Sequence, residues 1–121
     1  MKKPIAVSEM DYASFDIVVV PFPYADRLAE KRRPALVVSA PALQKQYGLV
    51  WLMMITSADN PPWDCDVTIS DLKQAGVPAP SVVRPAKIAT VDAARVLRRI
   101  GKLAAKDAKK VKEAMRELIV D

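Results

Sequence analysis

The stretch EKRRPALVVS, residues 30–39, sets four consecutive charged side chains directly before a proline and an apolar run. The aliphatic and β-branched residues after the charges predict a strand over residues 34–39. The charges themselves predict a polar connection over residues 24–33. Two arginines thus directly precede the start of a core strand. Pro34 restricts the backbone of the residue before it and can hold Arg33 in a fixed direction.

Further strands are expected on both sides of this stretch, at residues 15–22, 49–56, 65–70, 81–91 and 96–101. These segments combine β-branched and aromatic residues with turn formers at their ends. Residues 49–56 are apolar on both faces, which predicts a deeply buried strand with Trp51 in the core. The strand at 81–91 should be broken at Pro85, because proline cannot donate a hydrogen bond to a neighbouring strand.

Three helices are expected as well. Residues 41–47 begin with proline and are followed by glycine. Residues 71–75 follow Ser70, a candidate N-cap, and residues 106–120 place apolar side chains at helical spacing. A chain of 121 residues with this order of elements predicts one α+β, mainly β domain, in which a helix lies against a small twisted sheet or barrel.

The composition is that of a globular protein with an excess of positive charge. Hydrophobic residues make up 51% of the chain, charged residues make up 27%, and the net charge is +5. Surplus basic residues suit a polyanionic partner such as RNA or DNA. The longest apolar run, residues 49–55, is too short to cross a bilayer, and no signal-like apolar core precedes it, so we expect a cytoplasmic protein that needs no membrane.

The chain contains no histidine and a single cysteine. The lack of histidine removes the commonest general base and the commonest metal ligand. Asp64, Asp66 and Asp71 have no glycine-bearing calcium loop around them and are interpreted as exposed strand carboxylates. Neither a metal nor a cofactor is therefore expected.

Five blocks of the sequence resemble one known family in their order and spacing. The blocks are FDIVVVPFPYAD at 15–26, KRRPALVVSAPALQ at 31–44, ITS at 55–57, SVVRPAKIATVD at 81–92 and RRIGKL at 98–103. The family they resemble is that of the PemK/MazF toxins of bacterial type II toxin-antitoxin systems. The resemblance covers residues 15–121 as a single toxin domain and leaves residues 1–14 as an N-terminal extension.

This resemblance implies a fold, an activity and a set of partners. The fold would be a small SH3-like β-barrel of the CcdB/PemK/MazF type, with short helices and a C-terminal α-helix, usually as a homodimer. The activity would be metal-independent, sequence-selective cleavage of single-stranded RNA, above all mRNA, which inhibits growth. The partners would be that RNA and a cognate antitoxin whose flexible tail occupies the RNA groove and with which the toxin binds DNA.

The resemblance also carries over catalytic residues. Arg33 of the Arg-Pro step and Thr56 of ITS match the family's catalytic pair, and Arg84 of VVR matches a further arginine that acts in some members. Two positions depart from the pattern. Phe15 replaces a common glycine, and Ala86 stands where some members have an aspartate, so a catalytic carboxylate is missing at that position.

The chemistry of metal-free RNA cleavage suits these side chains. The ribose 2′-OH attacks the neighbouring phosphate, so the enzyme must remove a proton, stabilise a doubly charged phosphorane and protonate the leaving oxygen. The permanently charged fork of Arg33 can grip two phosphoryl oxygens, and the hydroxyl of Thr56 can bond to the same phosphate from a rigid strand end. An arginine is a poor base, so the candidates for proton removal are Asp16, Asp26 and Glu30.

RNA is expected to lie along a groove between residues 24–32 and the loop after Thr56. Tyr24 and Trp63 are the side chains there that can stack on bases. The expected RNA-binding residues are Tyr24, Asp26, Arg27, Lys31, Arg32, Ser57, Trp63 and Lys87.

Other interpretations of the same residues stay open. The arginine pair can be a solvated strand edge that resists aggregation, and Thr56 can be an ordinary strand-end hydroxyl. A noncatalytic poison of DNA gyrase with a related fold is an alternative function, as is a barrel that has lost catalysis and only binds RNA or a protein. The intact RRP and ITS motifs favour the nuclease.

Overall fold

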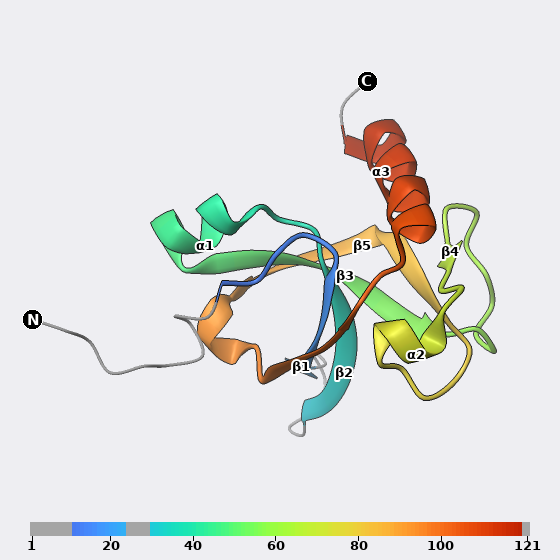
Figure 1. Cartoon of the computed structure of the whole chain (residues 1–121), viewed down its shortest axis with the longest axis horizontal. Helices are drawn as coiled ribbons and strands as arrows, with labels where there is room; N and C mark the ends of the chain where they lie inside the picture. The colour runs from blue at the N-terminus through green and yellow to red at the C-terminus, as the bar shows by residue number, and fades with distance from the viewer. Residues whose placement is uncertain (1–10, 24–29, 120–121) are drawn as a thin grey trace, which may run out of the picture.

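The computed structural model describes residues 11–23 and 30–119. Within them, six strands pair antiparallel in one sheet of order β4-β5-β3-β2-β1-β6. The strands are β1 (Asp16–Pro23), β2 (Glu30–Val37), β3 (Leu49–Ser57), β4 (Val67–Thr68), β5 (Ser81–Asp92) and β6 (Arg98–Lys102). The sheet curls on itself, with α1 (Pro41–Tyr47) at one end and α2 (Leu72–Ala75) and α3 (Ala105–Ile119) at the other (Figure 1). The expected mainly β fold with a C-terminal helix is confirmed.

Both faces of the curled sheet are buried over its central strands. Successive side chains of a strand point to opposite faces, and here they enter two different cores. The first core lies between the sheet and the helices α2 and α3, and it includes Ile17, Leu36, Met53, Ile55, Val83, Ala75, Ala108 and Val111. The second core lies on the other face of the sheet and includes Tyr12, Val18, Val20, Ala35, Val37, Val50, Leu52, Ala93 and Val96. The site described below lies where the second core ends.

Local signals predicted helix α1 correctly at both ends. Pro41 occupies its first turn, and Gly48 ends it with a φ of 69°, a left-handed conformation that glycine adopts at little cost. A buried side chain on this helix, Gln44, accepts a hydrogen bond from the backbone N–H of Tyr12 at 3.2 Å. Tyr12 belongs to the stretch 1–14 that was expected to be an extension, yet it is buried in the second core.

Strand β2 begins four residues earlier than expected. The connection predicted over residues 24–33 was wrong for residues 30–33, because they continue the hairpin with β1 through the register Val20 to Arg33 and Pro23 to Glu30. The pairing partner, rather than the local charge, determines where this strand starts.

Three further expectations need correction or refinement. Trp51 is 45% exposed, so its prediction as a core residue was wrong; the first core reaches Met53 on the same strand face but not Trp51. The strand expected at 65–70 has only two paired residues, in β4. The expected break at Pro85 is a shift in register, since Met53 pairs with Ile88 and the next residue pairs with Arg84.

The short helix α2 is capped by a different residue from the one expected. Its N-cap is Asp71, whose carboxylate accepts the N–H of Gln74 at 2.9 Å. Ser70 instead donates its backbone N–H and its hydroxyl to the buried Asp107 of α3, at 2.9 and 2.8 Å.

Among the described residues, no helix combines the length and the apolar character needed to cross a membrane.

Candidate active site

The three arginine and threonine side chains expected to be catalytic share one face of the sheet. The pairing of β2 with β3 includes Ala35 opposite Met54, and two residues further along these strands are Arg33 and Thr56. Arg84 of β5 pairs with Met54 from the other side. Because side chains two apart on a strand point the same way, Arg33, Thr56 and Arg84 share the face of the sheet that carries Ala35 and Val20 of the second core. The Cα atoms of residues diagonally opposite on paired strands, as Thr56 and Arg84 are, lie roughly 7 to 8 Å apart.

The two neighbouring arginines point in opposite directions. Arg33 pairs with Val20, which is buried in the second core, and its Nε atom is itself buried. Arg32 pairs with Pro21 and therefore faces the other side of the hairpin, where it is exposed. Lys31 is exposed and, two residues from Arg33, returns to the face of the site. The structure brings Arg33 to the site and keeps Arg32 away from it.

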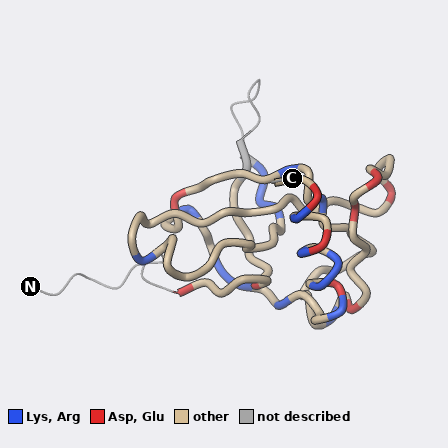
Figure 2. Tube along the Cα trace, turned by 90° about the horizontal axis from the view of Figure 1, so that it is seen from above, with Lys and Arg blue, Asp and Glu red and all other residues tan. Residues whose placement is uncertain are grey.

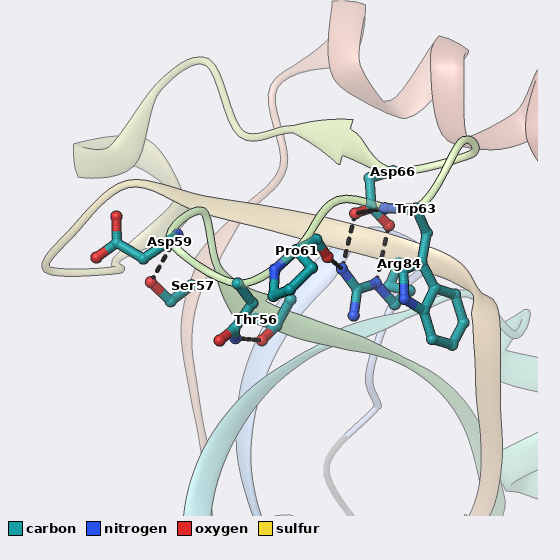
Figure 3. A network of polar contacts seen from close by, with 8 residues as sticks. Thr56, Ser57, Asp59, Pro61, Trp63, Asp66 and Arg84 are labelled. Atoms are coloured by element: carbon teal, nitrogen blue, oxygen red, sulfur yellow. Dashed lines mark hydrogen bonds and ion pairs between the residues drawn. The ribbon is translucent and has the colours of Figure 1, made fainter.

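The hydroxyl of Thr56 is held from one side by the loop that follows it. Its Oγ1 accepts a hydrogen bond from the side-chain amide of Asn60 at 2.6 Å (Figure 3). The turn is closed by the backbone N–H of Asn60, which donates to the carbonyl of Ser57, and by the N–H of Asp59, which donates to the Ser57 hydroxyl. Since Thr56 accepts from Asn60, its own proton can be donated elsewhere. Asn60 was not found from the sequence, where it gave only a turn signal.

Arg84 is fixed by an ion pair with Asp66. Its Nε donates to Asp66 Oδ1 at 2.9 Å and its Nη2 donates to Oδ2 at 2.8 Å and to the carbonyl of Pro61 at 3.1 Å (Figure 3). The side chains of Arg84 and Asp66 are 9% and 8% exposed. The hydrogen bond from Arg84 lowers the pKa of Asp66. Asp66 was expected to be an exposed strand carboxylate, and that interpretation was wrong.

Trp63 lies on this ion pair at the rim of the site. The guanidinium carbon of Arg84 is 4.4 Å from the centre of the indole ring, and the Nζ atom of Lys87 is 5.8 Å from it. Trp63 is 43% exposed. A depression of about 400 Å³ lies on the same part of the sheet, lined by Leu52, Met54, Ala86, Lys87, Ile88 and Ala89. Its floor is apolar, and Lys87 belongs both to its lining and to the surroundings of the indole.

Asp16 is separate from this site. Its buried carboxylate accepts the N–H of Ala13 at 2.8 Å and forms ion pairs with Arg99 at 3.3 Å and Lys102 at 3.5 Å. Along β1 it precedes the residue that pairs with Arg33 by four positions, which is about 13 Å. The structure therefore does not bring Asp16 to Arg33.

Several expected site residues lie outside the described residues. Tyr24, Asp26 and Arg27 are among them, and of Glu30 only the backbone is described, as the first residue of β2. Within residues 11–23 and 30–119, no three cysteine or acidic side chains come together as ligands for a metal ion. Basic residues are not confined to the site, because lysine and arginine positions, coloured blue in Figure 2, also occur along α3.

Comparison with known proteins agrees with the fold and the motifs. The sequence model of the family of PemK-like, MazF-like toxins of type II toxin-antitoxin systems matches residues 13–119, and the chain belongs to this family. A comparison with curated protein sequences finds no match.

Solved structures of toxins share the fold. A MazE-MazF structure from Deinococcus radiodurans is 24% identical with a TM-score of 0.74, over 92% of this chain and 97% of that one. The Mycobacterium tuberculosis toxin MazF-mt6 is 21% identical with a TM-score of 0.69, over 88% and 98%. A mycobacterial endoribonuclease in complex with its cognate antitoxin is 14% identical with a TM-score of 0.68, over 88% and 91%.

Proposed function

We propose that this protein is the toxin of a type II toxin-antitoxin system and acts as a metal-independent, sequence-selective endoribonuclease on single-stranded RNA. The observation that carries the proposal is the shared face of Arg33, Thr56 and Arg84 beside an apolar depression with basic and aromatic neighbours. Membership of the toxin family supports it, as does the fold shared with a mycobacterial endoribonuclease.

The proposed reaction is an internal transfer at one phosphate. The 2′-oxygen of the ribose forms a bond to phosphorus, the bond from phosphorus to the 5′-oxygen breaks, and the products are a 2′,3′-cyclic phosphate and a 5′-hydroxyl. Arg33 donates to two of the negatively charged oxygens of the phosphorane, and the hydroxyl of Thr56, which accepts from Asn60, donates its own proton to another. Within the described part of the chain, Asp66 and Pro61 engage Nε and Nη2 of Arg84, which leaves Nη1 to donate to the same phosphate.

One of two carboxylates, Asp26, which lies between β1 and β2 in the sequence, or Glu30, the first residue of β2, is assigned to take the proton of the 2′-OH and to return it to the 5′-oxygen as that oxygen leaves phosphorus. Asp16 is too far along β1 and already neutralised by two cations. Asp66 is unsuited to the role because its lowered pKa makes it a weak base.

The proposed partners follow from the same assignment. RNA lies along the depression, with Lys87 in its lining and Trp63 next to Lys87. The protein forms a homodimer in the cytoplasm and is held inactive by a cognate antitoxin. Structures of MazE-MazF and of an endoribonuclease with its antitoxin, both of this fold, support that partner.

The test is cleavage of long single-stranded RNA of mixed sequence in excess EDTA by folded, antitoxin-free protein. Discrete cuts with cyclic-phosphate ends are expected. Arg33→Ala and Thr56→Val should cut at least about a hundredfold more slowly, because each removes a donor aimed at the phosphorane. Arg32→Ala and Thr90→Val are the matched controls, since Arg32 lies on the opposite face of β2 and the exposed Thr90 pairs with Trp51, whose side chain is on the face of β3 opposite to Thr56. An absence of cuts by the wild type would overturn the proposal.

A further inference from the structure

The indole of Trp63 is partly covered by cationic side chains and partly exposed. Arg84 covers the ring with its guanidinium at 4.4 Å, while the residue as a whole is 43% exposed. Lys87 stands at 5.8 Å from the ring centre. An aromatic surface beside a lysine is the combination by which single-stranded nucleic acids are bound, since bases stack on the ring and the cation meets the phosphate.

The position of the indole is set by a single carboxylate. Asp66 binds the guanidinium that underlies the ring through two hydrogen bonds, of 2.9 and 2.8 Å. Its Oδ2 atom also accepts the backbone N–H of Trp63 at 2.9 Å, and its own N–H donates to the carbonyl of Trp63 at 3.0 Å. Both the backbone and the ring of Trp63 thus contact the ion pair of Arg84 and Asp66, whose two side chains are nearly buried. A ring held in this way loses little conformational freedom when a base stacks on it.

The same loop reaches the reacting centre. Asn60, which binds the hydroxyl of Thr56, stands three residues before Trp63 on a segment stiffened by two prolines. Figure 3 shows Thr56, Arg84 and Trp63 along this loop in that order. A phosphate at Thr56 would therefore place a neighbouring nucleotide at the indole.

We propose that Trp63 is a stacking subsite for a base next to the cleaved phosphate, and that Asp66 is the positioning residue that holds it there through Arg84. This inference rests on the proposed nuclease function and deepens it. The loop from Ser57 to Asp66 is then a determinant of which RNA sequences are cut.

The first test measures kinetics on a short RNA that contains one mapped cut site. Trp63→Ala should raise KM by about fivefold to a hundredfold, the range for losing one stacked base, with kcat changed by less than about threefold. Trp63→Phe should recover most of the loss. Asp66→Asn should raise KM in the same direction, whereas Asp64→Asn, which removes the same charge two residues away, should leave KM unchanged.

The second test distinguishes stacking from a structural role. RNAs that carry an abasic nucleotide at each position beside the cut are compared with the intact RNA. At one position, the abasic nucleotide should weaken binding to the wild type by the same factor by which Trp63→Ala weakens binding to intact RNA. The abasic nucleotide at that position should not weaken binding to Trp63→Ala any further. A variant that loses affinity equally for intact and abasic RNA at every position would overturn the inference, and so would an unchanged KM.

A binding test separates this inference from the proposed catalysis. The chain has two tryptophans, so Trp51→Phe leaves Trp63 as the single indole reporter. Mixed-sequence 2′-O-methyl RNA, which cannot be cleaved by 2′-OH attack, should quench its fluorescence, and Asp66→Asn should weaken the quenching. Quenching without any RNA cleavage would refute the nuclease alone, and cleavage without quenching would refute the stacking subsite alone.

Discussion

Removal of the Asp66 carboxylate should destabilise the protein by about 3 kcal/mol, because it leaves a nearly buried guanidinium without its counterion. The two hydrogen bonds from Arg84, of 2.9 and 2.8 Å, join side chains that are 9% and 8% exposed. Charge-assisted hydrogen bonds of this kind contribute about 1.5–3 kcal/mol each, and the remaining contact of Arg84 with the carbonyl of Pro61 keeps part of its stabilisation.

Urea unfolding of Asp66→Ala, Arg84→Met and the double variant measures this coupling. Asp66→Ala should lower the free energy of unfolding by about 3 kcal/mol, which for a domain of this size lowers Tm by roughly 10 °C. The double variant should be more stable than Asp66→Ala alone, because it removes the uncompensated charge as well. A loss below about 1 kcal/mol in Asp66→Ala, or strictly additive effects, would refute this account of the ion pair.

The stability that Asp66 contributes depends on pH with a definite sign. The hydrogen bond from Arg84 lowers the pKa of Asp66 below its ordinary value of 3.8, so the carboxylate stabilises the fold fully above that value. The stabilisation is lost as the pH falls through the lower pKa of the folded state. The stability difference between the wild type and Asp66→Asn should therefore be constant from about pH 8 to about pH 5 and shrink in stronger acid.

Two other pairs of substitutions give predictions that urea unfolding can check. Gly76→Ala should lower the free energy of unfolding by about 3 kcal/mol, since φ of Gly76 is 77° and a Cβ there would overlap the backbone carbonyl of Ile100. Gly48→Ala should lower it by only about 1 kcal/mol, because Gly48 has a similar φ of 69° but open space around it. Equal losses would show that the close approach of Ile100 is unimportant. Asp107→Ala should cost about 2 kcal/mol by removing the acceptor of both donors of Ser70, and Ser70→Ala, which removes one donor, should cost about half as much; the opposite order would contradict that assignment.

Elements whose limits are set locally could be predicted from the sequence. Proline at the start and a left-handed glycine at the end bound α1, and both signals act within a few residues. The identity of Arg33 and Thr56 as candidates came from motifs, and the structure places them on one face of the sheet. Neither motif could show that Arg32 points away, because that depends on which residue of β1 pairs with it.

Features that depend on distant contacts were missed. Asp66 was interpreted as an exposed carboxylate, since nothing nearby in the chain suggests a partner, yet its partner Arg84 is 18 residues away on the neighbouring strand. Trp51 was assigned to the core because its strand is apolar throughout, but the helices that cover the first core do not cover it. Hydrophobicity predicts that the centre of a strand is buried, but it does not predict how far along the strand the helices that pack on it extend.

The most direct test of the proposed chemistry replaces one ribose at a mapped cut site by 2′-deoxyribose and repeats the incubation in excess EDTA. We expect the wild type to bind both RNAs alike, to cut the unmodified strand to a 2′,3′-cyclic phosphate and to leave the deoxy strand intact at that position. Cleavage of the deoxy strand at the original rate would contradict attack by the 2′-OH and with it the proposed roles of Arg33 and Thr56.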